Sequence, residues 1–489
     1  MAIALTPRER RGLVSLIALV AGARFATLGL YPLMDSTESR YAEIARKMLE
    51  TGNWLTPQFD YGVPFWGKPP LSTWLAAASM AGFGVNEFAA RLPSFALLVI
   101  CGALVGALAA MRGGRDQAVW TLALFSTTGL VFIAAGAVMT DPALVVGTTL
   151  SMAGFRVALE GPDRYRLPAS IAFFAGLAIG LLAKGPVAMV LTFVPIAIWT
   201  VATRQWRAAW QRLPWIRGIA FAAVLVVPWY WAAERATPGF LDYFLVGEHW
   251  KRFVEPGWAG DLYGAAHARP RGLIWAYWFV SALPWSGVAI AGVVRAATTR
   301  RDAARAFFAD RSRVYLLAWA VTPMLFFTAS GNILATYVLP GLPALALLIG
   351  DLWHPEAVDA GPLRPAARAV LVAGVLIVVV FVAGIAALQP RFANVLSHKG
   401  LVERYEALRA GGDGRLIYVG QRPASAEFYA RGRAMRVDSV AALSPYLDDG
   451  VVDFVVLRAN DLAASAALRA RLAPVGDFGD YRLLREVQK

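Results

Sequence analysis

Hydrophobic positions along this chain form long, nearly unbroken stretches separated by short polar loops. Each stretch approaches the ~20 residues that cross a ~30 Å hydrocarbon core at ~1.5 Å per residue. Eleven stretches meet this description: 12–31, 93–111, 118–136, 141–158, 168–183, 186–203, 216–233, 273–297, 313–329, 335–352 and 366–388. The pattern predicts an all-α, polytopic membrane domain over residues 1–390.

Composition supports that prediction. Of the 489 residues 58% are hydrophobic and only 16% are charged, whereas a soluble domain has about 25% charged residues. Lys and Arg exceed Asp and Glu by 47 to 33, and the arginines cluster in alternate loops. The clusters lie at 8–11, 112–115, 164–166, 204–212, 300–311 and 364–368. This positive-inside pattern predicts a cytoplasmic N-terminus and an external C-terminus, and it explains the basic charge without nucleic acid.

Two segments depart from the spanning pattern. Residues 71–84 are apolar but short, and counting them as a span would reverse the side of every later arginine cluster, so we expect them not to cross. Residues 391–489 alternate strand-like runs at 415–420, 434–437, 451–457 and 480–484 with helical runs at 424–431 and 465–472. This tail is long enough for a small periplasmic α/β domain, to which its sequence assigns no chemistry.

The periplasmic loop 32–92 is too long to be a turn. Apolar residues recur at helical spacing after Asp35, which predicts an amphipathic helix along the membrane surface with its charged face turned away. Asp35 and Glu38 have the spacing of a capping box, which is one interpretation. The other is functional: Asp35 is a candidate catalytic carboxylate supported by Glu38, with Arg40 and Lys68 as candidate ligands of a substrate.

The periplasmic loop 234–272 concentrates cations on the side where they are least expected. His249, Arg252, His267 and Arg269 are candidate ligands of an anionic substrate, with attraction to anionic lipid as the alternative. Two residues at the outer ends of spans complete the set. Asp141 is either a helix cap or a supporting acid, and Tyr337 is either an interfacial anchor or a substrate ligand.

A carboxylate and several cations at the outer lipid–water boundary suit sugar transfer from a lipid-linked phosphate. Cations stabilise the charge that develops on the leaving phosphate, and a carboxylate activates the acceptor. The expected partners are therefore a sugar linked to a lipid phosphate, an acceptor for that sugar, and membrane lipids. We expect no metal or other cofactor to be required. A lipid or solute transporter is the alternative, and a scaffold or receptor is a third class.

Several motifs resemble those of GT-C membrane glycosyltransferases, in the branch of the lipid A aminoarabinose transferases related to protein O-mannosyltransferases. The matching segments are DSTESRYAEIAR at 35–46, GKPPL at 67–71, ARLPS at 90–94, Thr140-Asp141, Glu248-His249 with Arg252-Phe253, Pro284-Trp285 and 337–340. The resemblance covers roughly residues 10–350. It implies an inverting transferase of the bacterial inner membrane with a periplasmic active site. The implied donor is a polyprenyl-phosphate sugar, and the implied acceptor is lipid A, a glycan or a protein.

The resemblance also implies roles for individual residues. Asp35 corresponds to the essential first-loop carboxylate and Asp141 to a second acidic position, while Lys68, Arg252 and Tyr337 are candidates for binding the donor phosphate. Two positions depart from the aminoarabinose transferases: Gly67 replaces a carboxylate before the lysine, and Asn332 stands where lysine is common. These departures leave the donor sugar open among a hexose, a uronic acid and a pentose.

Overall fold

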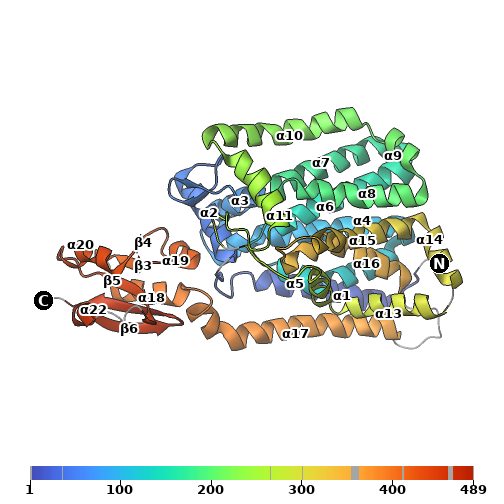
Figure 1. Cartoon of the computed structure of the whole chain (residues 1–489). Coiled ribbons are helices and arrows are strands. Elements are labelled where there is room, and N and C mark those ends of the chain that lie inside the picture. Colours follow the sequence, from blue (N-terminus) through green and yellow to red (C-terminus); the bar gives the residue numbers. More distant parts are fainter. Residues whose placement is uncertain are drawn as a thin grey trace. The chain divides into compact units, whose positions relative to one another are not determined.

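The computed structural model describes residues 3–35, 37–264, 266–299, 301–353, 363–409, 412–460 and 466–487. The chain packs into two compact units (Figure 1). The first comprises Met1–Ala26, Asn53–Leu75 and Arg91–Val380, and the second comprises Thr27–Gly52, Ala76–Ala90 and Phe381–Lys489. Ser36, Arg300 and Ser465, which occur in segments considered above, lie outside the described residues. The predicted domain boundary at residue 390 stays a prediction.

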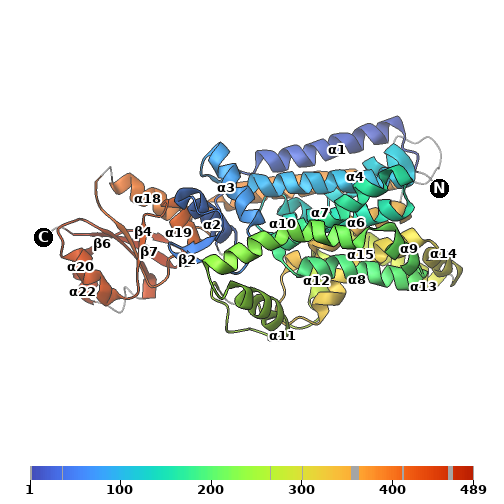
Figure 2. The same ribbon diagram turned by 90° about the horizontal axis from the view of Figure 1, so that it is seen from above.

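Helices form most of the first unit, and their positions follow the hydrophobic stretches. Their bounds are α1 (Pro7–Ala26), α3 (Leu71–Phe83), α4 (Glu87–Ser126), α5 (Gly129–Ala134), α6 (Asp141–Glu160), η1 (Asp163–Tyr165), α7 (Arg166–Lys184), α8 (Val187–Thr203), α9 (Trp206–Arg212), α10 (Trp215–Ala236), η2 (Asp242–Lys251), α11 (Arg252–Val254), α12 (Ile274–Ser281), α13 (Trp285–Thr299), α14 (Arg301–Ala309), α15 (Arg311–Thr328), η3 (Ala335–Gly341), α16 (Leu342–Leu352) and α17 (Pro365–Asn394). A short hairpin of β1 (Gln58–Asp60) and β2 (Val63–Pro64) precedes α3. Helix α7 packs against α6, α8 and α10 (Figure 2).

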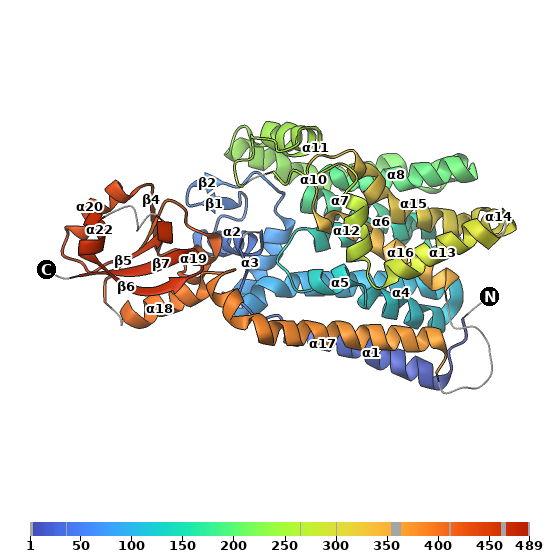
Figure 3. The same cartoon turned by 60° about the horizontal axis from the view of Figure 1, so that its bottom comes forward.

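Three expected spans are interrupted by residues that break helices. Helix α4 covers the stretch 93–111 and the first part of 118–136, and it kinks between them at Gly113 and Gly114, where Gly114 has φ +74°. The stretch 118–136 is interrupted where α4 ends at Ser126, and α5 forms its second part. The stretch 273–297 is two helices, α12 and α13, which meet at 112° (Figure 3). Pro284 lies in this break, and proline cannot donate the backbone hydrogen bond that would continue α12. The stretch 335–352 begins with the 3₁₀ helix η3.

Six helices in the described part of the chain are long and apolar enough to cross a membrane, or seven if α12 and α13 form one bent span. The chain is therefore a multi-pass membrane protein, as predicted, while the count of eleven spans stays a prediction. Helix α3 is shorter than a span, and its expected position outside the membrane core also stays a prediction.

The second unit contains helix α2 (Thr37–Thr51) and a five-stranded mixed sheet in the order β4-β3-β5-β7-β6. The strands are β3 (Leu416–Val419), β4 (Ala434–Val437), β5 (Phe454–Arg458), β6 (Leu472–Phe478) and β7 (Tyr481–Glu486), and the helices are α18 (Lys399–Arg409), α19 (Ala424–Tyr429), η4 (Val440–Leu443), α20 (Ser444–Leu447) and α22 (Ala466–Arg471). The four predicted strands and both helical runs are present. Strand β6 and helix α18 were not predicted. Strand β6 contains Pro474 and lies at the sheet edge, where proline is tolerated.

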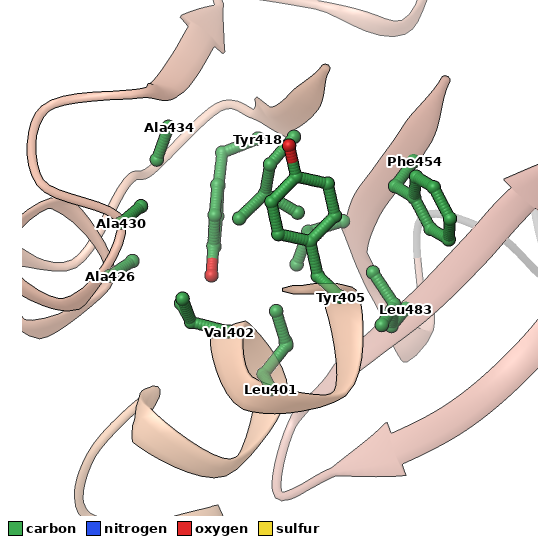
Figure 4. Packing of buried hydrophobic residues seen from close by; sticks show 11 residues of the cluster. Leu401, Val402, Tyr405, Tyr418, Ala426, Ala430, Ala434, Phe454 and Leu483 are labelled. Carbon is green, nitrogen blue, oxygen red and sulfur yellow. The ribbon is translucent and has the colours of Figure 1, made fainter. Parts of the chain in front are cut away.

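Alternate residues of each strand face opposite layers of helix, as the two-residue period of a strand requires. On one face, Tyr418 and Phe454 pack with Leu401 and Tyr405 of α18 (Figure 4). The opposite face carries Ile417, Val455 and Leu484, which pack against Leu443, Leu447 and Leu468. The tail is therefore a three-layer α/β/α domain, which confirms its predicted class.

Candidate functional site

The loop that carries Lys68 is tied to the loop after α10. The backbone N–H of Trp66 donates to the Tyr263 hydroxyl (2.9 Å), which in turn donates to the carbonyl of Pro64 (2.8 Å). The indole N–H of Trp66 donates to Oγ1 of Thr237 (3.0 Å). These bonds hold residues 64–68 beside residues 237–263, so parts of the two long loops that were singled out from the sequence meet within the first unit.

A π-helix, η2, carries the acidic centre of the site. It packs on Gly185, which has φ +76° and leaves no room for a side chain, because a Cβ there would lie 2.5 Å from the Phe244 ring. Only glycine adopts this backbone readily. The close approach places η2 against the end of α7, and Glu248 on η2 is thereby buried beside Lys68.

Glu248 joins the two strongest phosphate-binding candidates. Its Oε2 lies 2.9 Å from Nζ of Lys68, and its Oε1 lies 2.8 Å from Nη1 of Arg252. Arg252 also lies 3.2 Å from Oδ2 of Asp261. The Glu248 side chain is only 2% exposed, whereas Lys68 and Arg252 are 20% and 18% exposed. The two cations therefore reach the surface while their shared anion stays beneath them. We call Lys68, Glu248, Arg252 and Asp261 the Glu248 cluster.

Glu248 and Arg252 both stay charged at neutral pH. Burial on its own would raise the pKa of Glu248, but Lys68 and Arg252 outweigh burial and lower it to about 2. Burial also acts against the charge of Arg252, yet Glu248 and Asp261 raise its pKa above the ordinary value. Two cations and two carboxylates give a local charge near zero, which a small anion can approach without strong repulsion.

A second ion pair lies nearby. Lys184, the last residue of α7, places its Nζ 2.6 Å from Oδ1 of Asp141 and 4.7 Å from the centre of the Tyr337 ring. Tyr337 interacts electrostatically with Arg252, Lys68, Asp141 and Glu248. The first unit thus brings together Lys68, Asp141, Arg252 and Tyr337 as expected, and it adds Lys184.

Asn332 holds the chain that follows Arg252. Its amide nitrogen donates to the carbonyls of Arg252 and Glu255, both at 2.6 Å, and its Oδ1 accepts the N–H of Gly257 (2.9 Å). The amide uses its donors and its acceptor in a buried position. A lysine cannot replace these contacts because it has no acceptor, so the departure noted in the sequence has a structural reason.

The two histidines and Arg269 make hydrogen bonds with the backbone of the loops around the site. His249 is buried, and its ring nitrogens face the carbonyls of Phe244 (2.8 Å) and Lys184 (3.1 Å). Burial lowers its pKa, against the effect of those carbonyls. Arg269 is exposed and its Nη1 donates to the Ala268 carbonyl (3.2 Å), and the carbonyl of His267 accepts from Ile333 (3.2 Å). These contacts stabilise the loop, and the role of the three residues as substrate ligands stays a prediction.

Asp35, Glu38 and Arg40 belong to the second unit. Oδ1 of Asp35 accepts from the hydroxyl of Ser39 (2.6 Å) and from the N–H of Ser425 (2.9 Å), and its Oδ2 accepts from the Ser425 hydroxyl. Glu38 accepts the backbone N–H of Met34 (3.2 Å), whereas the N–H of Asp35 donates to the carbonyl of Leu396 (2.9 Å), so the return bond of the expected capping box is not made. The guanidinium of Arg40 lies over the Tyr41 ring at 5.6 Å.

The charged face of α2 is not exposed, which corrects the prediction of a helix with an outward polar face. Glu43, Arg46 and Lys47 are 2%, 4% and 0% exposed. Arg46 binds both carboxylate oxygens of Glu43 at 2.7 Å, and Lys47 lies 2.8 Å from Oε1 of Glu427 in α19. The amphipathic pattern was real, but the charged residues of its polar face form ion pairs, with Arg46 pairing to Glu43 within α2 and Lys47 pairing to Glu427 of the C-terminal domain. A helix pattern does not show what covers a polar face.

Sequence reasoning did not select Lys184, Glu248, Asn332 or Ser425 as site residues. Lys184 had a signal, because it is a cation in a two-residue loop on the side where cations are rare. Ser425 had none. Within the described ranges no group of three or more His, Cys, Asp or Glu side chains could hold a metal ion, and the expectation that no cofactor is required stays a prediction.

The geometry defines a class of fold that solved structures share. The crystal structure of ArnT from Cupriavidus metallidurans in the apo state matches with a TM-score of 0.77 at 19% identity, covering 97% of each chain. The structure of that protein bound to undecaprenyl phosphate gives 0.74 at 21% identity and covers 97% of this chain and 98% of that one. The predicted GT-C membrane fold with a small C-terminal α/β domain is confirmed.

Sequence comparisons point to the same group. The family described as dolichyl-phosphate-mannose-protein mannosyltransferase matches residues 13–244. An undecaprenyl phosphate-alpha-4-amino-4-deoxy-L-arabinose arabinosyl transferase from Pseudomonas savastanoi is 32% identical over 348 residues, or 70% of this chain and 61% of that protein. A protein of the same name from Pseudomonas aeruginosa is 30% identical over 70% of this chain and 60% of its own. The chain therefore spans about three fifths of the length of these relatives. The resemblance predicted from the motifs is confirmed.

Proposed function

We propose that this protein is an inverting glycosyltransferase that moves a sugar from a polyprenyl-phosphate donor to a cell-envelope acceptor. The site faces the periplasm, with the N-terminus in the cytoplasm and the C-terminus outside. The acceptor is lipid A, a glycan or a protein. The relatives named for arabinosyl transfer from undecaprenyl phosphate support this class of donor, while Gly67 and Asn332 leave the sugar open.

The observation that carries the proposal is the Glu248 cluster. A lysine ammonium has three donors, and Lys68 uses two of them, toward Glu248 and its neighbouring carbonyl of Gly67. Arg252 directs Nη1 to Glu248 and Asp261, and a guanidinium has five N–H donors in total. Both side chains are partly exposed, so each retains donor capacity toward a ligand while Glu248 fixes its direction.

The charge of this site suits a glycosyl phosphodiester. The donor carries one negative charge on its phosphate, and the leaving phosphate gains a second as the bond between C1 and the phosphate oxygen breaks. Lys68 and Arg252 stabilise that second charge because they are held in place before the reaction. Tyr337 and Lys184, with its partner Asp141, supply further polar groups of the same unit.

Inversion requires the acceptor oxygen to attack C1 from the face opposite the leaving phosphate. The bond from acceptor oxygen to C1 forms as the C1–phosphate bond breaks, and an acceptor hydroxyl then loses its proton to a base. Asp35 is our candidate for this base, as the sequence predicted. A carboxylate has about four lone-pair positions and three are occupied by Ser39 and Ser425, which leaves one for a substrate.

The contacts of the charges within the spans do not favour the transporter alternative. Transporters use such charges to bind solutes at mid-membrane. Arg24 of α1 instead donates to the carbonyls of Phe132 (3.0 Å) and Ile133 (3.1 Å) at the end of α5, and Arg156 pairs with Glu160 (2.6 Å). These contacts stabilise helix ends and side-chain pairs of the fold.

Transfer in detergent solution tests the proposal, because transport has no meaning there. Purified protein is incubated with radiolabelled polyprenyl-phosphate sugars and extracted envelope lipids. We expect label in the acceptor fraction for one donor sugar, and at least tenfold less at limiting donor with Lys68→Met protein. Absence of transfer from pentose, hexose and uronic-acid donors alike, by protein that is folded and monodisperse, would refute the function.

A further inference from the structure

Helix α19 of the C-terminal domain makes three separate polar contacts with the segments of loop 32–92 that belong to the same unit. Ser425 binds Asp35, Glu427 pairs with Lys47, and the hydroxyl of Tyr429 donates to Oε1 of Glu87 (3.0 Å). These three residues alternate along a six-residue helix. Each one meets a different part of the loop, so the short helix fixes the loop at several points.

Asp35 is the most constrained of the three loop residues. Its backbone N–H donates to the carbonyl of Leu396 (2.9 Å), and its carboxylate accepts from both the N–H and the hydroxyl of Ser425. Ser425 is 0% exposed, and its hydroxyl oxygen also accepts the N–H of His398 (2.9 Å). The serine hydroxyl is thus held by one N–H and directed at one carboxylate oxygen.

This geometry differs from ordinary capping. For capping alone, one bond from the N–H of Ser425 to Asp35 would suffice, because it gives a partner to a backbone N–H that has none within the first turn of α19. The hydroxyl adds a second bond, to the other carboxylate oxygen, which fixes the rotation of the carboxylate plane. With Ser39 on Oδ1 and Ser425 on both oxygens, the direction of the remaining lone pair is set largely by the C-terminal domain.

We infer that Ser425 is a positioning residue for Asp35, and that the C-terminal domain, through α19, orients the carboxylate of the first loop for transfer. The inference rests on the proposed role of Asp35 in the transferase. It assigns a function to the C-terminal domain, for which the sequence indicated none. The domain acts by holding Asp35 and needs no contact of its own with the sugar.

Steady-state kinetics of Ser425→Ala protein test the inference. Removing the hydroxyl leaves the N–H bond and the Ser39 bond intact, so we expect kcat to fall about tenfold, as for the loss of one oriented hydrogen bond. The donor KM stays within twofold, because Lys68 and Arg252 are unchanged. Ser397→Ala is the matched control, since Ser397 is an equally buried serine of the same domain (1% exposed), and it retains the wild-type kcat. A wild-type kcat in Ser425→Ala protein would overturn the inference.

Hydrogen–deuterium exchange of the full chain provides a readout that does not depend on activity. We expect amides 37–42, at the start of α2, to exchange at least threefold faster in Ser425→Ala than in Ser397→Ala protein. In protein that carries both Ser425→Ala and Asp35→Asn, these amides should exchange about as fast as in either single variant, because both substitutions act on the same contact. Unchanged exchange in Ser425→Ala would contradict the positioning role even if wild-type protein transfers sugar. Absence of transfer by wild-type protein with the expected exchange would instead refute the proposed function.

Discussion

Nζ of Lys68 lies 2.9 Å from Oε2 of Glu248, a carboxylate 180 residues further along the chain. The lysine comes from a proline-rich loop and the glutamate from a π-helix, and each is fixed before any substrate arrives. Because Glu248 is buried and ionised, it fixes the direction of the Lys68 ammonium group. The arrangement is suited to binding an anion at the exposed side of the lysine.

Replacing the cations should weaken donor binding without loss of the fold. Hydrogen bonds to charged groups contribute about 1.5–3 kcal/mol, so Lys68→Met should raise the donor KM about ten- to a hundredfold. Arg252→Lys keeps the charge but loses the planar fork, and we expect an increase of about tenfold. Lys251→Ala is the control, because Lys251 is an exposed neighbour on η2. Equal KM values for the three variants and the wild type would show that the cations do not bind the donor.

Removing the charge of Glu248 should have opposite effects on stability and on binding. In Glu248→Gln protein two partly buried cations lose their shared anion, which typically costs about 3–5 kcal/mol. We expect a lower thermal midpoint together with a larger stabilisation by added undecaprenyl phosphate than the wild type shows. Thermal unfolding with and without that lipid measures both effects. A lipid-induced shift no larger than that of the wild type would mean that Glu248 does not balance the phosphate-binding charge.

The pH dependence follows from the pKa of Glu248, which is lowered from 4.5 to about 2. A lowered carboxyl pKa stabilises the folded state fully above about pH 4.5, and this contribution, about 3 kcal/mol, is lost progressively as the pH falls from 4.5 to about 2. We therefore expect the donor KM to stay constant within twofold between pH 5 and 8. Measuring KM across that range checks the prediction. A tenfold rise toward pH 5 would show that Glu248 is protonated there.

Gly185 should not tolerate a side chain. Alanine at this position combines a backbone with φ +76° and a contact of 2.5 Å with Phe244, so Gly185→Ala should destabilise the protein by about 2–4 kcal/mol. Gly292→Ala in α13 is the control, because nothing lies within 4 Å of its Cβ position. The difference in thermal midpoint between the two variants is the measurement. Equal midpoints would show that η2 does not need this close approach.

The sequence predicted most of the helices and strands because their signals are local. Hydrophobic stretches of the right length specified α6, α7, α8 and α10, and short continuous runs of apolar residues specified β3 and β5. The kink of α4 at Gly113 and Gly114 lies in the polar loop that was predicted between two spans. The break between α12 and α13 was less visible, since hydropathy continues across Pro284. Strand β6 escaped prediction because proline and glycine in an edge strand resemble a loop.

The site could be predicted only as a set of residue types. Lys68, Asp141, Arg252 and Tyr337 were expected together, and they interact. Their partners were harder to select, because Glu248, Lys184 and Asn332 act through pairings across 180, 43 and 80 residues. The buried polar face of α2 depends on Glu427, far along the chain, and no pattern within the helix indicates that contact.

Binding of the lipid phosphate tests the central claim most directly. Native mass spectrometry of purified protein measures the fraction that retains undecaprenyl phosphate at a fixed lipid concentration. We predict that wild-type and Lys251→Ala protein retain the lipid equally and that Lys68→Met/Arg252→Met protein loses at least nine tenths of it. Equal retention by the double variant, with an unchanged α-helical circular dichroism spectrum, would contradict the assignment of the Glu248 cluster as the phosphate site.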